Sequence, residues 1–237
     1  MTKEDIRDHF EAIADDYDRW KERSSYYCEL LAGAYRELVP EGSSVLEIGC
    51  GTGTLLASLR PRRGVGVDIS PRMVAIAAAK YPDLSFLVAD AEALDLGETF
   101  EYIIVPDVIE HLSDVGAMFR SARLHSAPGT RVIVSSVNPL WAPILHLAER
   151  LGLKMPEGEH RWLSSRDLQA LAGGTGFTVR EEHGRILLPK KVPLAARLLN
   201  RLAGRFGFFR PFCLTQVIVL ELRGARPDPV GSSSADK

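Results

Sequence analysis

Short apolar runs alternate with segments that have the signals of helices from Ser43 onward. Runs that are apolar throughout are typical of strands buried on both faces. Strands that alternate with helices form βαβ units, which build a parallel sheet covered by helices on both sides. The predicted strands are 43–48, 65–68, 84–88, 101–105, 130–136, 177–183 and 215–222. The pattern therefore predicts an α/β fold with a mostly parallel sheet.

Polar residues that can cap a helix stand before several of the predicted helices. Ser70 is a predicted N-cap, and it is followed by Pro71 at the first helical position. Ser113 is placed to cap the next helix, and Ser164 with Asp167 has the spacing of a capping box. A glycine-rich stretch is expected to end the helix that Ser164 begins.

The length of 237 residues predicts one domain, which we place at 1–222. Residues 1–40 are expected to form an N-terminal helical cap. The segments 138–163 and 184–213 fall outside the alternation and are interpreted as insertions. Residues 223–237 are rich in Pro, Gly and Ser and are predicted to be a disordered tail.

Net charge, cysteine content and the lack of long apolar runs exclude several classes of protein. A formal net charge of −2 argues against a polyanion binder that acts by overall charge. The three cysteines, Cys28, Cys50 and Cys213, are odd in number and fit neither a zinc cluster nor a disulfide framework. The chain starts without an apolar signal region and has no apolar run long enough to span a bilayer. These features predict a reduced, cytoplasmic setting.

The stretch VLEIGCGTG, residues 45–53, places an acid and three alternate glycines directly after the first predicted strand. Ligands of open parallel sheets bind at the carboxyl ends of the strands, and glycines let the backbone approach a ligand closely. A threonine at position 54 departs from the dinucleotide pattern G-x-G-x-x-G. Glu47 would repel a pyrophosphate but suits an amino group or a cationic centre. The alternative is a tight turn without a ligand.

This stretch resembles motif I of the class I S-adenosylmethionine-dependent methyltransferases, and further motifs follow in order over 45–111. The best match is the small-molecule branch that includes the methyltransferases of ubiquinone and menaquinone biosynthesis. The segment FEAIADDYDRW also resembles that branch, where it folds over the cofactor. The resemblance implies a seven-stranded, mostly parallel, Rossmann-like sheet, with S-adenosylmethionine as cofactor and S-adenosylhomocysteine as product.

The resemblance also implies roles for single residues. Asp68 matches the acid that accepts hydrogen bonds from the ribose hydroxyls, and Asp90 matches the acid that accepts from the adenine amino group. Ile69 and Met73 are expected to line the adenine pocket, with ordinary core packing as the alternative. The full set of expected cofactor-binding residues is Tyr17, Glu47, Gly49, Cys50, Gly51, Gly53, Asp68, Ile69, Met73, Asp90, Ala91, Glu92 and Pro106.

The segment VPDVIEHLSDV, residues 105–115, follows the fourth strand and is expected to supply the acceptor-side chemistry. It lacks the N/D-P-P-Y/F sequence and the Pro-Cys pair used on nucleic-acid bases, so we expect no nucleic-acid substrate. His111 is the predicted general base because its usual pKa is nearest neutrality. The alternative is a histidine that only packs or caps a helix.

Asp107, Glu110 and His111 form D-x-x-E-H, a spacing that shares one face of a helix. It is similar to the E-x-x-E-H with which ubiquinone O-methyltransferases and small-RNA 3′-terminal methyltransferases hold a divalent metal. A metal there would lower the pKa of a substrate hydroxyl. Aspartate in place of the first glutamate shortens the reach, so the sequence favours a metal-free site with Asp107 and His111 as catalytic candidates, and a divalent metal held by Asp107, Glu110 and His111 is the alternative.

The insertion 138–163 is expected to face the acceptor. His160 is a further candidate base, and Trp20, Trp141, Arg161 and Trp162 are the predicted substrate-binding residues. The alternative for Trp20 is ordinary packing of an amphipathic helix, and for Trp141 packing that holds its insertion down. His146 is another side chain expected to face the substrate.

No acid lies between Glu182 and Glu221, and the segment 193–206 within this stretch has the pattern of a basic amphipathic helix. It predicts reversible contact with an anionic membrane surface, or with a phosphate on the substrate, and hence a peripheral position at the inner membrane face. The alternative is a surface helix with a solvated arginine face.

The predicted function is S-adenosylmethionine-dependent methylation of a small-molecule acceptor, at a hydroxyl oxygen. Methylation at carbon or nitrogen of a small or lipid-linked metabolite is one alternative. A cofactor-binding regulatory module without activity is another. The sequence leaves the acceptor and the oligomeric state open.

Overall fold

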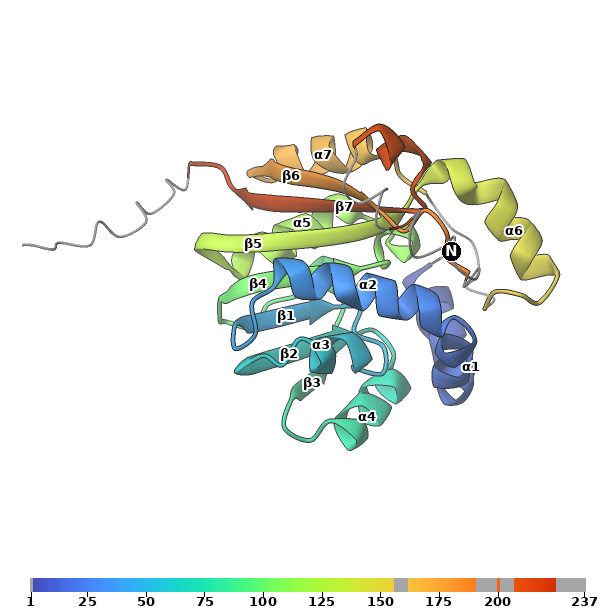
Figure 1. The fold of residues 1–237 in the computed structure, drawn as a ribbon. Coiled ribbons are helices and arrows are strands. Elements are labelled where there is room, and N and C mark those ends of the chain that lie inside the picture. The colour runs from blue at the N-terminus through green and yellow to red at the C-terminus, as the bar shows by residue number, and fades with distance from the viewer. Residues whose placement is uncertain (1, 156–161, 191–199, 201–206, 225–237) are drawn as a thin grey trace, which may run out of the picture.

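The computed structural model describes residues 2–155, 162–190, 200 and 207–224. Its centre is one seven-stranded sheet with the order β3-β2-β1-β4-β5-β7-β6, drawn in Figure 1. All neighbouring strands are parallel except β7, which runs antiparallel to both β5 and β6. The strands are β1 (Ser44–Ile48), β2 (Arg63–Asp68), β3 (Ser85–Val88), β4 (Phe100–Pro106), β5 (Ser126–Val137), β6 (Phe177–Arg185) and β7 (Thr215–Leu222). The predicted fold class is confirmed.

Helices precede and connect the strands. The N-terminal segment forms two of them, as predicted for 1–40. The α-helices are α1 (Lys3–Arg23), α2 (Ser25–Leu38), α3 (Thr54–Ser58), α4 (Pro71–Lys80), α5 (Val115–Leu124), α6 (Ala142–Arg150) and α7 (Ser165–Gly174). The short 3₁₀ helices are η1 (Ala91–Ala93), η2 (Ile109–His111), η3 (Pro139–Trp141) and η4 (Gly207–Phe212).

Two of the three predicted helix caps are confirmed. Ser70 accepts from the Met73 N–H, and Ser164 forms a capping box with Asp167. The prediction for Ser113 was wrong, because Asp114 caps α5. The Ser113 N–H instead donates to the carboxylate of Glu92.

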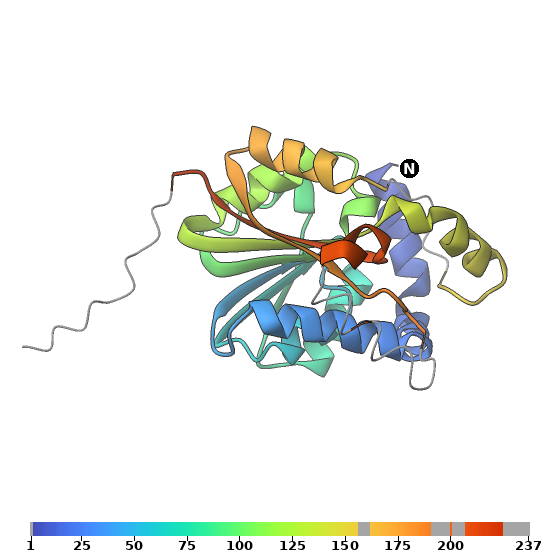
Figure 2. The same cartoon turned by 45° about the horizontal axis from the view of Figure 1, so that its top comes forward.

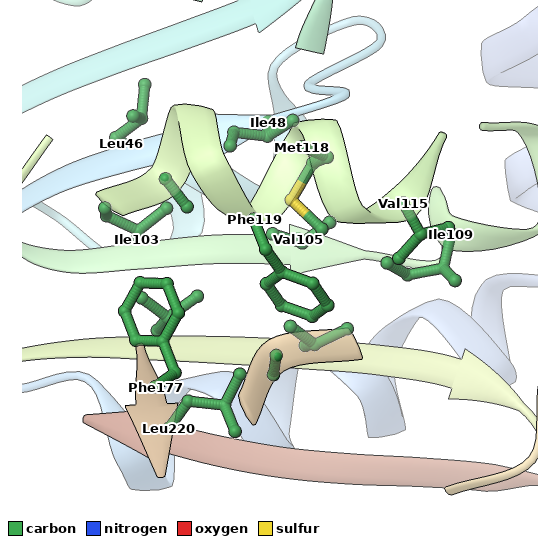
Figure 3. Close-up of a cluster of buried hydrophobic side chains, with 14 of the residues drawn as sticks. Leu46, Ile48, Ile103, Val105, Ile109, Val115, Met118, Phe119, Phe177 and Leu220 are labelled. Carbon is green, nitrogen blue, oxygen red and sulfur yellow. The ribbon is translucent and has the colours of Figure 1, made fainter. Parts of the chain in front are cut away.

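Both faces of the sheet are buried over its central strands, such as β1, β2 and β4, which explains their continuous apolar runs. On β4, Ile103 packs in the cluster under α5, and its neighbour Ile104 packs in the cluster under α2. Met118 and Phe119 of α5 fill the first cluster, seen in Figure 3. Successive side chains of a strand point to opposite faces, so each strand stabilises both layers. Loops at the carboxyl ends of the strands are then the part of this scaffold free to form a site.

Three sequence predictions fall at least partly outside the described residues. Of the basic segment 193–206, only Asn200 is described, and of the tail 223–237 only two residues. His160 and Arg161 also lie outside. Within the described part of the chain, no helix combines the length and apolarity needed to cross a membrane.

Candidate active site

The loop after β1 is built from three glycines in left-handed backbone conformations. Gly49, Gly51 and Gly53 have φ values of 75°, 50° and 77°. A Cβ on Gly49 would lie 2.1 Å from a methyl group of Val108, and one on Gly53 would lie 2.6 Å from the ring of Phe86. Both the conformation and the space therefore require glycine.

Glu47 supports this loop from beneath. Its side chain is buried, and its carboxylate accepts from the Leu56 N–H in the first turns of α3 at 3.0 Å. Burial raises the pKa of Glu47 to about 8. The acid expected to face a cationic ligand is thus held against the loop itself in this structure.

Asp68 ends β2 and joins the loop to the next helix. Its carboxylate accepts from the Gly51 N–H at 2.8 Å and from the Ser70 N–H at 3.0 Å. Burial raises the pKa of Asp68. The carboxylate therefore lies between the glycine loop and the start of α4, a suitable position for an acceptor of hydroxyl hydrogen bonds.

Asp90 follows β3 and forms an ion pair with Lys3, at the start of α1. Its carboxylate accepts from the Glu92 N–H at 2.8 Å and from Lys3 Nζ at 2.6 Å. Lys3 also pairs with Glu92 at 2.9 Å. Asp90 and Glu92, both predicted to bind the cofactor, thus contact Lys3 of α1.

Helix α1 lies across the loops that follow β1, β2 and β3, at the carboxyl end of the parallel strands (Figures 1 and 2). The ring of Tyr17 lies against Gly51. Asp18 accepts from the Thr52 hydroxyl at 2.7 Å, and Glu11 accepts from the Ser70 hydroxyl at 2.6 Å. The predicted cap is therefore tied to the glycine loop and to the start of α4.

The other predicted cofactor residues separate into buried and accessible groups. Met73 and Cys50 are buried, and Met73 packs as core, the alternative left open for it. Ile69, Ala91 and Pro106 are half-buried at the ends of β2, β3 and β4. These three residues are brought to the same edge of the sheet as Asp68.

Asp107 lies where β4 ends, with an unusual backbone conformation. Its φ is 51°, a left-handed value that is strained for a residue with a side chain. Its carboxylate accepts from the Ser135 hydroxyl at 2.7 Å and from the Tyr27 hydroxyl at 2.6 Å. Burial raises the pKa of Tyr27 well above its usual value, so the phenol stays protonated and donates.

The prediction that Asp107, Glu110 and His111 share a helical face was wrong. A left-handed residue and a 3₁₀ turn replace the expected α-helix, and the Glu110 carboxylate is buried, where it accepts from the Val137 N–H at 2.6 Å. In the described part of the chain, no group of three His, Cys, Asp or Glu side chains could hold a metal ion. The carboxylates are used as structural hydrogen-bond acceptors instead.

His111 is half-buried and packs against α1. Its ring lies edge-on to Phe10, with ring centroids 5.2 Å apart. The candidate base therefore lies at the border between the loop after β4 and the helical cap.

The predicted acceptor-side residues are only partly brought together. Trp141 Nε1 donates to the Phe212 carbonyl at 3.0 Å, so this indole anchors its insertion to η4. The Trp162 ring packs against the His146 ring at a tilt of 36°, with ring centroids 5.0 Å apart. Trp20 instead pairs with Arg23 of its own helix, 4.7 Å from ring centroid to guanidinium carbon.

Sequence reasoning missed Lys3, Glu11, Asp18 and Tyr27. All lie in the N-terminal segment, where charged side chains read as a solvated helix face. Only the tertiary packing of α1 and α2 against the loops gives them partners. The spacing along α1 offered a weak signal, since Glu11 and Asp18 are seven residues apart and so lie on one face.

Comparisons with known proteins agree with this geometry. Residues 19–182 match the family described as a methyltransferase domain. A relative from Azorhizobium caulinodans, named ubiquinone biosynthesis O-methyltransferase, is 34% identical over 169 residues, covering 65% of this chain and 66% of that protein. One from Rhodopseudomonas palustris strain HaA2, with the same name, is 31% identical over 62% of this chain and 63% of that protein. The matches thus span just under two-thirds of these relatives.

Solved structures share the fold. An S-adenosylmethionine-dependent methyltransferase from Thermotoga maritima has a TM-score of 0.69 and 22% identity, covering 91% of this chain and 99% of the other. Magnesium protoporphyrin IX methyltransferase from Synechocystis PCC 6803, with bound S-adenosylhomocysteine, has a TM-score of 0.62 and 20% identity, covering 94% of this chain and 99% of the other. By its matched domain, its sheet and its glycine loop, the chain belongs to the class I S-adenosylmethionine-dependent methyltransferases.

Proposed function

We propose that this enzyme methylates a hydroxyl oxygen of a small molecule, with S-adenosylmethionine bound over the loop after β1. The observation that supports the position is the joining of Gly51 to the Asp68 carboxylate beneath α1. The names of the Azorhizobium and Rhodopseudomonas relatives, both O-methyltransferases, support oxygen as the methylated atom.

The residues at the loop fit this cofactor. Glycines that exclude a Cβ leave the backbone open to close approach by the methionine portion. Asp68 would accept from the two ribose hydroxyls, and Asp90 from the adenine amino group, beside Ile69 and Ala91. Bound there, S-adenosylmethionine supplies a methyl group on a positively charged sulfur. Tyr17 and α1 would cover the site and exclude water.

The chain must also handle the proton of the acceptor. As the acceptor oxygen bonds to the methyl carbon, the carbon–sulfur bond breaks and the hydroxyl proton leaves. His111 is the proposed base, because imidazole can accept a proton near neutral pH and lies at the border of the cap. Asp107, whose carboxylate is fixed by Tyr27 and Ser135, is a proposed second group on this side.

Calorimetry tests the cofactor assignment, with S-adenosylhomocysteine as the ligand and NAD as the control. We expect binding of the first and none of the second. Incubation of the protein with methyl-labelled S-adenosylmethionine and a panel of small hydroxyl compounds, followed by mass spectrometry, tests the transfer. Label on carbon or nitrogen would contradict oxygen as the acceptor. Binding without any transfer would favour the regulatory alternative.

Metal dependence follows from the same assay. The hydrogen bonds of Asp107 and Glu110 lead us to expect that excess chelator leaves turnover unchanged. Loss of turnover that added magnesium or zinc restores would contradict this expectation.

A further inference from the structure

The Asp90 carboxylate has a donor on each of its two oxygens. Oδ1 accepts from the Glu92 N–H at 2.8 Å, and Oδ2 accepts from Lys3 Nζ at 2.6 Å. The side chains of Lys3 and Asp90 are 38% and 32% exposed, so a small ligand group can reach the pair. This carboxylate is also the proposed acceptor for the adenine amino group of the cofactor. The ammonium group of Lys3 thus holds the oxygen that a cofactor donor would need.

Glu92 gives Lys3 a second carboxylate. Its Oε2 lies 2.9 Å from Lys3 Nζ, and its side chain is only 6% exposed. Its other oxygen accepts from the Ser113 and Asp114 N–H groups at 2.7 and 3.0 Å, which fixes this carboxylate before α5. A lysine that leaves Asp90 can therefore stay paired with Glu92. Exchange on Asp90 needs only a rotation of the flexible lysine side chain and leaves α1 in place.

We propose that Lys3 is a specificity-determining residue of the cofactor site, where its ammonium group competes with the adenine amino group for Asp90. The inference rests on the proposed binding of S-adenosylmethionine and deepens it. Both groups donate N–H hydrogen bonds, and Oδ2 is the oxygen for which they compete because Oδ1 already accepts from the Glu92 N–H. Lys3 belongs to the chain, so its concentration at Asp90 is high whatever the ligand. The hydrogen bonds to Asp90 and Glu92 raise the pKa of Lys3, which keeps it charged.

The competition makes the site sensitive to the group at C6 of the purine. Adenine has an amino group there, which donates to Oδ2 of Asp90 only after Lys3 has moved. Hypoxanthine has a carbonyl oxygen there, which a carboxylate repels and an ammonium group attracts. Lys3 can remain on Asp90 and donate another of its N–H bonds to that oxygen. Lys3 therefore weakens binding of the amino purine and strengthens binding of the carbonyl purine.

The rival role for Lys3 is to hold α1 over the site. Lys3 is the first residue of α1, and its ion pairs join the helix to the segment after β3. In that role, loss of Lys3 would weaken every ligand beneath the helix, whatever its C6 group. Helix α1 has other bonds to the loops, however, since Glu11 accepts from the Ser70 hydroxyl and Asp18 from the Thr52 hydroxyl. We therefore expect the helix to stay in place without Lys3.

Isothermal calorimetry with two ligands tests the competition. S-adenosylhomocysteine has the amino group at C6, and S-inosylhomocysteine has a carbonyl oxygen at the same position. Lys3→Met removes the charge and keeps an unbranched side chain, whereas Lys3→Arg keeps the charge. Arg7→Met is the matched control, because Arg7 is an exposed cation of the same helix that pairs with its neighbour Asp8. Thermal unfolding checks that each variant is folded.

The two ligands should respond to Lys3→Met with opposite signs. We expect this variant to bind S-adenosylhomocysteine about twofold to fivefold more tightly than wild type, the range that a partly exposed ion pair supports. It should bind S-inosylhomocysteine at least about twofold more weakly, because the carbonyl oxygen loses its donor. Lys3→Arg should lie closer to wild type than Lys3→Met does, and Arg7→Met should match wild type. Added salt should narrow the gap between wild type and Lys3→Met, because ions screen an exposed pair.

Several results would overturn the proposal. Equal shifts for the two ligands, in either direction, would show that Lys3 does not act on the C6 group, and a joint weakening would assign Lys3 to holding α1. Unchanged affinities in Lys3→Met would remove Lys3 from the site. The same opposite shifts in Arg7→Met would make net charge the cause. Wild-type protein that binds neither ligand would contradict the proposed cofactor itself, and the competition with it.

Discussion

The two borders of the site are built in opposite ways. On the side of β1, β2 and β3, charged groups of α1 meet partners in the loops, as Lys3 meets Asp90 and Asp18 meets Thr52. On the side of β5 and β7, α6 and η4 present aliphatic and aromatic side chains to solvent. The first border is specified by directional bonds that fix one geometry. The second is an apolar surface, and apolar contact has no direction.

The largest expected effect is at the glycine loop. Changing Gly49 to Ala adds a Cβ that collides with Val108 and imposes a left-handed conformation on a residue with a side chain. We expect the free energy of unfolding to fall by about 3–5 kcal/mol. Urea titration measures it. Gly42→Ala is the control, because Gly42 also has a positive φ but no neighbour within 4 Å. If both variants lost the same free energy of unfolding, close packing of the loop would not be the cause.

A pH-dependent effect should follow from Glu47. Its pKa is about 8 in the fold, above the usual value of a glutamate in an unfolded chain. The folded state therefore favours the protonated form, and the stability from this group is present at low pH and lost as pH rises toward 8. Between pH 5.5 and 7.5 we expect a loss of about 2 kcal/mol that Glu47→Gln abolishes.

Urea titrations of wild type and the Glu47 variant at the two pH values measure this difference. Glu101→Gln, at an exposed acid of β4, is the control and should leave the loss in place. The same pH dependence in wild type and the Glu47 variant would show that Glu47 is ionised in the fold.

The next expected effect is on ligand affinity at the charged border of the site. Asp68→Ala should weaken S-adenosylhomocysteine binding by about 1–3 kcal/mol, because ribose hydroxyls would lose a charged acceptor. Isothermal calorimetry measures the affinity. Asp83→Ala, at an exposed acid before β3, is the control. An unchanged affinity would contradict the role proposed for Asp68.

The smallest effect is expected on α6. Ile144→Ser or Leu147→Ser should change the free energy of unfolding by less than about 0.5 kcal/mol, since exposed side chains contribute little to the core. Urea titration of each single variant measures the change. A loss of several kcal/mol would show that these side chains are packed, and the contrast between the two borders would disappear.

The sequence predicted the parallel part of the fold because the relevant signals are local. An apolar run such as 101–105 predicts a strand buried on both faces, and Ser70 with Pro71 predicts the start of a helix. The glycine loop was predicted for the same reason, since its backbone conformations need particular residues at particular positions. Local rules failed at Asp107, where tertiary hydrogen bonds to Tyr27 and Ser135 accompany a left-handed residue in place of the expected helix.

The acceptor side was predicted less well because its contacts join distant parts of the chain. Tyr27 precedes Asp107 by 80 residues and Thr215 by 188, and no periodicity indicates that the three side chains meet. No sequence prediction covered the exposed row of aliphatic side chains on α6, because apolar spacing shows which side chains share a face, but not whether another element covers that face. Its exposure is known only from the three-dimensional structure.

The position of β7 has a consequence for how the protein is made. This strand is the last of the seven to leave the ribosome, yet it lies between β5 and β6 and pairs with both. Until it emerges, β6 has no neighbour in the sheet, and the unpaired edge of β5 is open to other chains. Chaperone demand during synthesis should therefore peak after β6 has emerged. Nascent chains stalled before Thr215 should aggregate, while those stalled beyond Leu222 and a linker should not.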